Sequence, residues 1–197
     1  MLKQSEIVTL FEKSGAYLTG HFLLTSGLHS PNYFQCAKVL QYPKNMTLLC
    51  MDIARKAETL RPEVILGPAI GGIVVAQEVG RILNLRTIFS ERENNEMTLR
   101  RGFELSKGER VFIVEDVFTT GKSIHEVRRL VAAAGAELIG AAVIVDRSGG
   151  RVDTGVAVDS LLTLEVVTHP PEDCPLCRQG LPLVKPGSRD QKKGQSK

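Results

Sequence analysis

The sequence contains no tryptophan, few aromatic residues and no long apolar segment. Aromatic residues make up 5% of its 197 residues while 43% are hydrophobic, so aliphatic side chains must fill the core. No stretch approaches the roughly 18 uninterrupted apolar residues that a membrane span needs, and the N-terminus lacks the layout of a signal peptide. The composition indicates a soluble globular protein of one domain, with room for a small appended lobe.

The net charge is also small, and the chain has few cysteines. A formal net charge of +3 is too small to favour a nucleic-acid or membrane partner. Four cysteines in a chain of this length do not form a disulfide framework. We therefore expect a cytoplasmic protein in a reducing compartment.

From residue 63 onward, short apolar runs alternate with amphipathic helix patterns. This rhythm predicts an α/β fold, a parallel sheet flanked by helices, with ligands bound beyond the carboxyl ends of the strands. A stretch rich in glycine, serine and aromatic residues over 20–38 predicts loops and short strands, and the polar stretch 91–109 predicts a loop. The predicted strands are 63–67, 86–90, 110–114 and 138–145, and the predicted helices are 5–13, 45–60, 71–83 and 122–134.

The strongest chemical signal is the segment VFIVEDVFTTGKS, which spans residues 111–123. An apolar strand ends in two adjacent carboxylates, and a turn of small residues then opens a helix. Free N–H groups at a helix start bind phosphate well, and the carboxylates suit vicinal hydroxyls or a divalent cation. The candidate ligand-binding residues are Glu115, Asp116, Val117, Phe118, Thr119, Thr120, Gly121, Lys122 and Ser123.

Two other interpretations of this segment carry less weight. Gly121-Lys122-Ser123 resembles the end of a nucleotide-binding P-loop, but Asp116 stands where the first glycine is required. The acidic pair could merely cap a strand-to-helix turn, yet two carboxylates at the end of an apolar strand are costly to desolvate without a partner.

A second glycine-rich turn follows the first predicted core strand. It reads GPAIGGI over residues 67–73, and Gly71 and Gly72 let the backbone approach a ligand closely at a helix start. The alternative is a turn that serves only tight packing of strand against helix.

The segment 111–123 resembles the phosphoribosyl pyrophosphate (PRPP) signature of type I phosphoribosyltransferases. The resemblance implies that Glu115 and Asp116 hold the ribose hydroxyls and that residues 119–123 cradle the 5′-phosphate. It places the pyrophosphate at Gly71 and Gly72, with Mg²⁺ bound alongside PRPP. It also implies the type I fold with a small N-terminal hood, and a homodimer whose mobile loop serves the neighbouring site.

The N-terminal segments 20–27 and 29–34 resemble orotate phosphoribosyltransferases in particular. By this resemblance Tyr33 and Phe34 close over the pyrimidine, and Thr119 and Arg147 contact orotate. A guanidinium after the fourth strand can grip a planar carboxylate with two parallel hydrogen bonds. The aromatic pair could instead pack in the core, and Arg147 could form a surface ion pair with Asp146.

The catalytic loop departs from the family pattern, because residues 91–103 contain neither lysine nor histidine. Arg92, Arg100 and Arg101 are the cations left to reach the pyrophosphate, unless they are solvated surface residues. The favoured function is conversion of orotate and PRPP to orotidine 5′-monophosphate and pyrophosphate, in pyrimidine biosynthesis. A phosphoribosyltransferase for a purine base and a non-catalytic PRPP sensor are the alternatives.

Cys174 and Cys177 form a CxxC pair near His169. The CxxC has metal-ligand spacing, but the sequence has no second CxxC to complete a tetrahedral zinc site, so two reduced thiols in a turn are favoured over the alternative of a structural metal. The expected organisation is a hood that includes the base-binding segment over 1–40, a phosphoribosyltransferase core over 41–168, a C-terminal extension over 169–188 and a disordered tail over 189–197.

Overall fold

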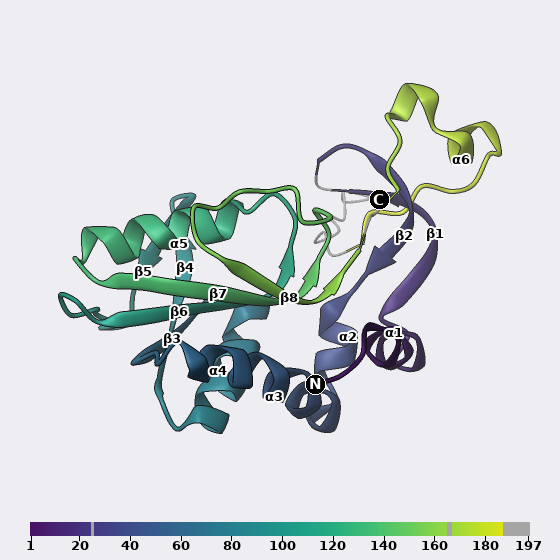
Figure 1. The fold of residues 1–197 in the computed structure, drawn as a ribbon. Coiled ribbons are helices and arrows are strands. Elements are labelled where there is room, and N and C mark those ends of the chain that lie inside the picture. The colour runs from purple at the N-terminus through teal and green to yellow at the C-terminus, as the bar shows by residue number, and fades with distance from the viewer. Residues whose placement is uncertain (25, 165–166, 187–197) are drawn as a thin grey trace, which may run out of the picture.

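The structure, a computed structural model, describes residues 1–24, 26–164 and 167–186 (Figure 1). Its centre is a six-stranded sheet in the order β5-β4-β3-β6-β7-β8. Every neighbouring pair is parallel except the edge pair β4–β5, which is antiparallel. The strands are β3 (Val64–Pro68), β4 (Arg86–Glu93), β5 (Glu96–Leu99), β6 (Arg110–Phe118), β7 (Glu137–Asp146) and β8 (Val158–Thr163).

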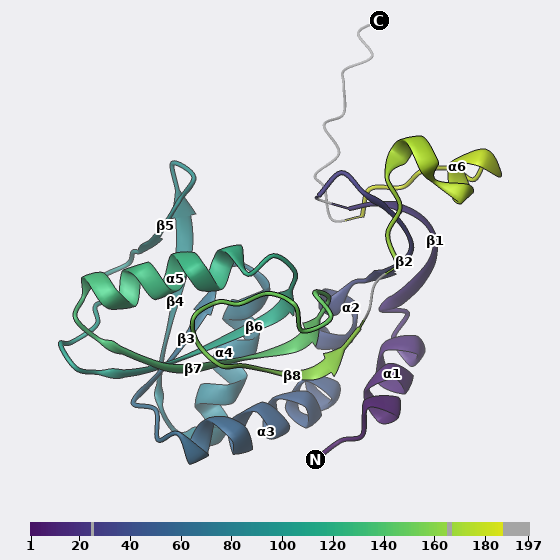
Figure 2. The same cartoon turned by 45° about the horizontal axis from the view of Figure 1, so that its top comes forward.

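Helices cover both faces of this sheet (Figures 1 and 2). Helices α3 (Pro43–Thr59) and α4 (Gly71–Leu83) lie on one face, and α5 (Lys122–Ala133) lies on the other. Each face has its own cluster of buried aliphatic side chains, which includes Ile53 and Val79 on the first face and Ile124 and Val127 on the second. Burial on both faces explains why β3 is buried along its whole length and reads as a continuous apolar run.

The N-terminal hood lies beyond the β8 edge of the sheet. It contains α1 (Gln4–Lys13), the antiparallel hairpin of β1 (Tyr17–Leu23) and β2 (His29–Phe34), and α2 (Cys36–Leu40). The C-terminal extension, with η1 (Pro171–Asp173) and α6 (Pro175–Arg178), returns to this hairpin. Its backbone pairs with both strands, through His169 with His29 and through Val184 with Phe22.

The polar stretch that was predicted to be a loop is a β-hairpin in its first part. Strand β4 continues to Glu93, and β5 pairs back on it. Asn94 and Asn95 both have positive φ, 50° and 68°, the turn geometry that asparagine tolerates best after glycine. The prediction was wrong because charged side chains conceal the strand pattern at an exposed sheet edge.

Further differences concern lengths and short elements. Strand β6 continues through the acidic pair to Phe118, because residues 115–118 still pair with β7. Helix α2 and strand β8 were not predicted. No helix among the described residues is long and apolar enough to cross a membrane. The predicted tail over 189–197 lies outside the described residues.

Candidate active site

The turn between β3 and α4 packs directly against the acidic pair. A Cβ atom added at Gly71 would lie 2.3 Å from the Asp116 carboxyl carbon, so any larger residue would displace that side chain. Gly72 is equally confined, because its Cβ would lie 2.9 Å from Pro68 Cδ. The structure thus brings together Gly71 and Asp116, which were predicted from separate motifs to contact neighbouring parts of one ligand.

Glu115 and Asp116 are consecutive residues near the carboxyl end of β6 and are partly buried. The Asp116 carboxylate lies against the Gly71 turn, and Glu115 accepts a hydrogen bond from Ser123 at the start of α5. Burial, the largest cause, and the neighbouring Asp116 charge together raise the pKa of Glu115 to about 8, although a hydrogen bond from Ser123 and the charge of Arg92 lower it. Burial also raises the pKa of Asp116, against backbone N–H donors that lower it. Such a pair favours ligands that donate hydrogen bonds or carry positive charge.

A small polar pocket of about 140 Å³ follows the acidic pair at the start of α5. We call it the phosphate pocket, after the ligand that its chemistry suits. Gly121 has φ of 73°, a left-handed conformation that lets residues 119–123 wrap around this space. The free N–H groups of the helix start line it, as a phosphate site requires. Its lining residues are Arg92, Glu115, Val117, Phe118, Thr119, Thr120, Gly121, Lys122 and Ser123, which include most of the predicted PRPP residues.

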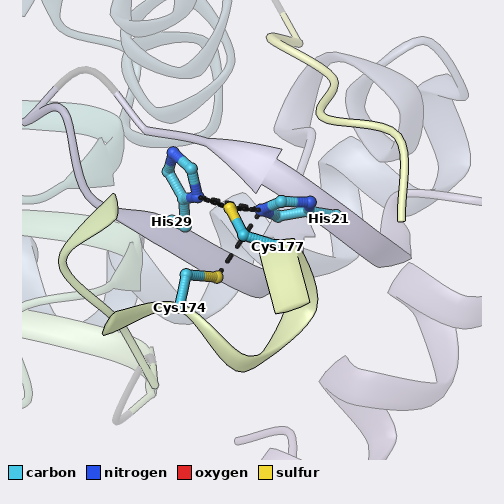
Figure 3. A group of neighbouring side chains, drawn as sticks. All are labelled: His21, His29, Cys174 and Cys177. Atoms are coloured by element: carbon cyan, nitrogen blue, oxygen red, sulfur yellow. Dashed lines mark hydrogen bonds between the residues drawn. The ribbon is translucent and has the colours of Figure 1, made fainter. Parts of the chain in front are cut away.

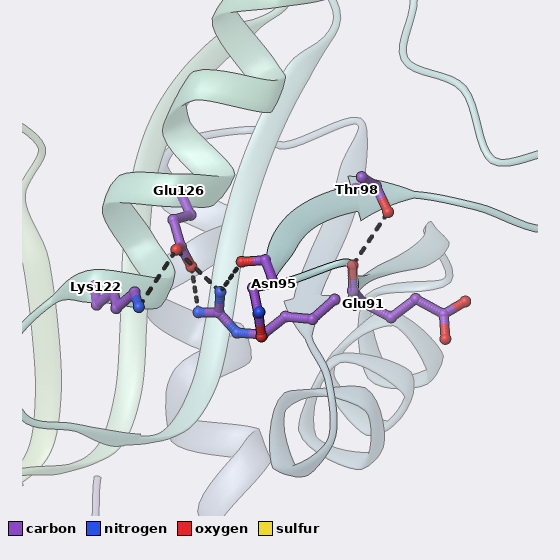
Figure 4. A network of polar contacts seen from close by, with 6 residues as sticks. Glu91, Asn95, Thr98, Lys122 and Glu126 are labelled. Atoms are coloured by element: carbon purple, nitrogen blue, oxygen red, sulfur yellow. Dashed lines mark hydrogen bonds and ion pairs between the residues drawn. The ribbon is translucent and has the colours of Figure 1, made fainter. Parts of the chain in front are cut away.

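Arg92 is the cation of the β4–β5 hairpin that reaches this pocket. Its guanidinium donates hydrogen bonds to both carboxylate oxygens of Glu126 on α5, and to the Asn95 carbonyl at 3.1 Å. Lys122 Nζ lies 4.0 Å from the same Glu126, and Figure 4 shows the Glu126, Lys122 and Asn95 side of this network. Glu126 therefore holds Arg92 beside the phosphate pocket and near Glu115.

Arg100 and Arg101 lie elsewhere and form ion pairs along β4. Arg101 Nε is 3.0 Å from Glu91, and its guanidinium carbon lies 5.7 Å from the centre of the Phe89 ring. Arg100 lies 3.3 Å from Glu93. The structure does not bring these two arginines to the phosphate pocket, so their predicted catalytic role has no geometric support within one chain.

A larger cleft of about 360 Å³ adjoins the phosphate pocket and shares Thr119 and Thr120 with it. Arg147 lines this cleft just after β7. Within the described part of the chain its Nε is buried and has no hydrogen-bond partner, and burial lowers its pKa. The cleft is lined by Leu24, Ser26, Thr119, Thr120, Arg147, Arg151 and Thr168.

The turn that carries Arg147 is fixed by its neighbour Asp146. The Asp146 carboxylate accepts hydrogen bonds from the Ser148 N–H at 2.7 Å and from the Gly150 N–H at 3.0 Å. The Arg147 N–H in turn donates to the Phe118 carbonyl at 2.8 Å. Asp146 therefore positions the backbone of this turn, in contrast to the surface ion pair considered as an alternative.

The two predicted aromatic residues have different environments. The Arg147 guanidinium carbon lies 5.4 Å from the centre of the Tyr33 ring, so Tyr33 packs against the arginine that lines the cleft. Phe34 is 7% exposed and packs in the core, 4.7 Å from the Tyr17 ring and 5.8 Å from the Phe11 ring. The structure thus brings Tyr33 to the cleft arginine but leaves Phe34 out of the cleft.

Four further residues line the cleft: Leu24, Ser26, Arg151 and Thr168. Leu24 and Ser26 lie in the segment 20–27, which the resemblance placed on the base side without singling them out. Arg151 and Thr168, from the loop after β7 and the approach to the C-terminal extension, were not predicted.

A phosphate pocket and a base-sized cleft that share two threonines, at the carboxyl edge of a mostly parallel sheet, are the arrangement of a type I phosphoribosyltransferase. The family model for the phosphoribosyl transferase domain matches residues 41–169. An orotate phosphoribosyltransferase from Pelotomaculum thermopropionicum is 55% identical, over 95% of this chain and 99% of that relative. A relative of the same name from Chlorobaculum parvum is 51% identical, over 98% of this chain and all of that relative. The chain belongs to the orotate phosphoribosyltransferases.

Solved structures agree on the fold. The crystal structure of orotate phosphoribosyltransferase from Aeropyrum pernix matches with a TM-score of 0.69 at 27% identity, over 81% of this chain and 94% of that chain. An adenine phosphoribosyltransferase from Trypanosoma brucei shares the fold at a TM-score of 0.62 and 20% identity, over 83% of this chain and 82% of that chain.

Proposed function

We propose that the cleft binds orotate and that the acidic pair and phosphate pocket bind PRPP, so that the chain forms orotidine 5′-monophosphate and pyrophosphate. The observation that carries this assignment is the Arg147 guanidinium, which lines the cleft with a buried Nε that has no hydrogen-bond partner among residues 1–24, 26–164 and 167–186. A planar guanidinium with an unsatisfied donor suits a planar carboxylate, which orotate has and the common purine bases lack.

In this proposal the protein acts mainly by positioning the two substrates. A bond forms between the pyrimidine nitrogen and the anomeric carbon as the bond from that carbon to the pyrophosphate oxygen breaks, and the proton of that nitrogen is released to solvent. Thr119 and Thr120 line both binding spaces, so they fix the distance between the base and the 5′-phosphate. Glu115 and Asp116 hold the ribose hydroxyls, and in their ionised forms they stabilise the positive charge that develops on the sugar.

Mg²⁺ is proposed to accompany PRPP. The paired carboxylates of Glu115 and Asp116 are hard oxygen donors, which fit a site where sugar hydroxyls and a hard cation share one region. When bound, Mg²⁺ supplies charge neutralisation of the departing pyrophosphate. The homodimer and the cytoplasmic location expected from the sequence stay predictions, and sedimentation of the purified chain tests the first.

The function is tested by the loss of orotate absorbance when the purified chain is mixed with PRPP and Mg²⁺. Uracil, adenine, guanine and hypoxanthine run in parallel. We expect turnover of orotate alone, and none when Mg²⁺ is removed with a chelator. Turnover of a purine instead would overturn the base assignment. Tight PRPP binding without turnover of any base would favour the sensor.

Arg92 is expected to be the loop cation that matters most for PRPP. Replacing Arg92 by Ala removes the guanidinium beside the phosphate pocket, and we expect kcat/KM for PRPP to fall about 10- to 100-fold. Arg100→Ala and Arg101→Ala are measured alongside, with Arg129→Ala on the exposed side of α5 as the control. A larger loss for Arg100 or Arg101 would show that the hairpin rearranges, or serves a partner chain, during turnover.

A further inference from the structure

Four potential metal ligands converge between the hood hairpin and the C-terminal extension (Figure 3). His21 lies on β1, His29 begins β2, and Cys174 and Cys177 flank the start of α6. Their ligand atoms all lie within 4.8 Å of one another, and all but Cys177 are buried. The cluster joins residues more than 140 positions apart in the sequence and takes no part in the proposed reaction.

Three nitrogen–sulfur distances within the cluster resemble the edges of a zinc tetrahedron. The Cys174 and Cys177 sulfurs lie 3.6 and 3.7 Å from His21 Nε2, and Cys177 Sγ lies 3.3 Å from His29 Nδ1. Zinc bonds of about 2.0–2.1 Å to nitrogen and about 2.3 Å to sulfur place N and S about 3.6 Å apart. The two nitrogens are 2.9 Å apart, a few tenths of an ångström closer than the about 3.3 Å of such a tetrahedron.

The hydrogen bonding of His21 leaves its other nitrogen available as a ligand. His21 Nδ1 lies 2.8 Å from the Leu181 carbonyl, which can only accept, so Nδ1 carries the proton. Nε2 of a neutral His21 is then unprotonated, and it faces the cluster. A backbone carbonyl that accepts a hydrogen bond from one ring nitrogen commonly orients a histidine whose other nitrogen ligates a metal. Without a metal, only weak thiol donors and one imidazole proton would join the four atoms.

We propose that His21, His29, Cys174 and Cys177 bind a structural zinc ion. Two nitrogens and two sulfurs form a donor set that zinc prefers, and four protein ligands leave no open position for catalysis. The CxxC pair alone did not suggest this site, because its partners are two histidines on distant strands rather than a second CxxC.

The ion would fasten the extension to the hairpin that shapes the base cleft. Backbone bonds already join the two parts, from Leu23 N–H to the Val184 carbonyl at 2.8 Å and from the Val184 N–H to the His21 carbonyl at 2.9 Å. Leu24 and Ser26 follow β1 and line the cleft, as does Thr168, just before the extension. Zinc binding should therefore stabilise the fold and help to form the orotate side of the site.

The test measures zinc by mass spectrometry in the full chain, purified under reducing conditions, and follows Co²⁺ exchange by absorbance. We expect one zinc per chain and a thiolate-to-cobalt charge-transfer band. Cys177→Ser, at the exposed ligand, and His21→Asn should lose both signals, while Cys50→Ala, at a buried thiol of α3, keeps them. Failure of the reduced chain to bind Zn²⁺ or Co²⁺ overturns the proposal, as does a Cys174–Cys177 disulfide in the purified chain.

A second readout separates this site from the catalytic one. Stripping the metal should lower the melting temperature by at least several degrees and raise KM for orotate more than KM for PRPP, and added Zn²⁺ should reverse both changes. An unchanged melting temperature in the stripped chain would contradict a structural role.

Discussion

Replacing Arg147 by Ala should lower kcat/KM for orotate by about 100- to 1000-fold while changing PRPP binding little. The guanidinium lines the cleft, its buried Nε has no partner in the part of the chain that the structure describes, and Asp146 fixes the turn that carries it. Two charge-assisted hydrogen bonds to the orotate carboxylate, each worth roughly 1.5–2 kcal/mol, account for a loss of this size. Steady-state kinetics with each substrate varied, and calorimetry of PRPP binding, measure the two effects separately.

Matched variants separate the contribution of bidentate hydrogen bonding by Arg147 from the contribution of its positive charge. Arg147→Lys keeps the charge but loses the planar fork, so it should recover only a small part of the lost activity. Arg129→Lys on α5 makes the same exchange outside the site and serves as the control. Binding of uracil, which lacks the carboxylate, should hardly change in Arg147→Ala. Equal losses for orotate and uracil would show that Arg147 supports the cleft without gripping the carboxylate.

The central α/β pattern was predictable because each buried strand and each amphipathic helix carries its own periodic signal. Helix α4 runs over the predicted residues 71–83, and β3 differs from its prediction by one residue at each end. The β4–β5 hairpin was missed because Glu91, Arg92 and Glu93 alternate charge on an exposed edge and give no apolar period. Local sequence patterns thus predict buried elements well, but they predict strand pairing at an exposed sheet edge poorly.

The residues of the candidate site also fall into those that a local sequence pattern predicts and those that only the fold brings together. Most residues that line the small polar pocket could be predicted because they are contiguous in the sequence, at the end of one strand. Phe34 was assigned to the base, yet it packs between Phe11 and Tyr17, which no local pattern distinguishes from a ligand contact. His21 and His29 lie far in sequence from Cys174 and Cys177, so only the fold brings the four together.

Glu115→Gln should remove a pH dependence that the wild type shows near pH 8. Burial, together with the neighbouring Asp116 charge, raises the pKa of Glu115 to about 8, so the free enzyme holds a proton there at neutral pH. If the ionised carboxylate accepts the ribose hydroxyls, kcat/KM for PRPP should rise about tenfold per pH unit below pH 8 and level off above it. Glutamine cannot ionise, so the rise in kcat/KM below pH 8 should be absent in the variant. At pH 9 its kcat/KM should be about 10- to 100-fold below that of the wild type.

Stability gives an independent check on the same group. A carboxyl whose pKa is higher in the folded chain than in the unfolded chain contributes stability that is complete below pH 4.5 and is lost as pH rises through about 8. The free energy of unfolding of the wild type, relative to Glu115→Gln, should therefore fall across that window in denaturant titrations. Glu137→Gln, in the exposed ion pair with Arg110, should show no such trend. A difference between wild type and Glu115→Gln that stays constant with pH would mean that Glu115 is already ionised at neutral pH. A pH dependence of kcat/KM for PRPP near pH 8 would then have to come from another group.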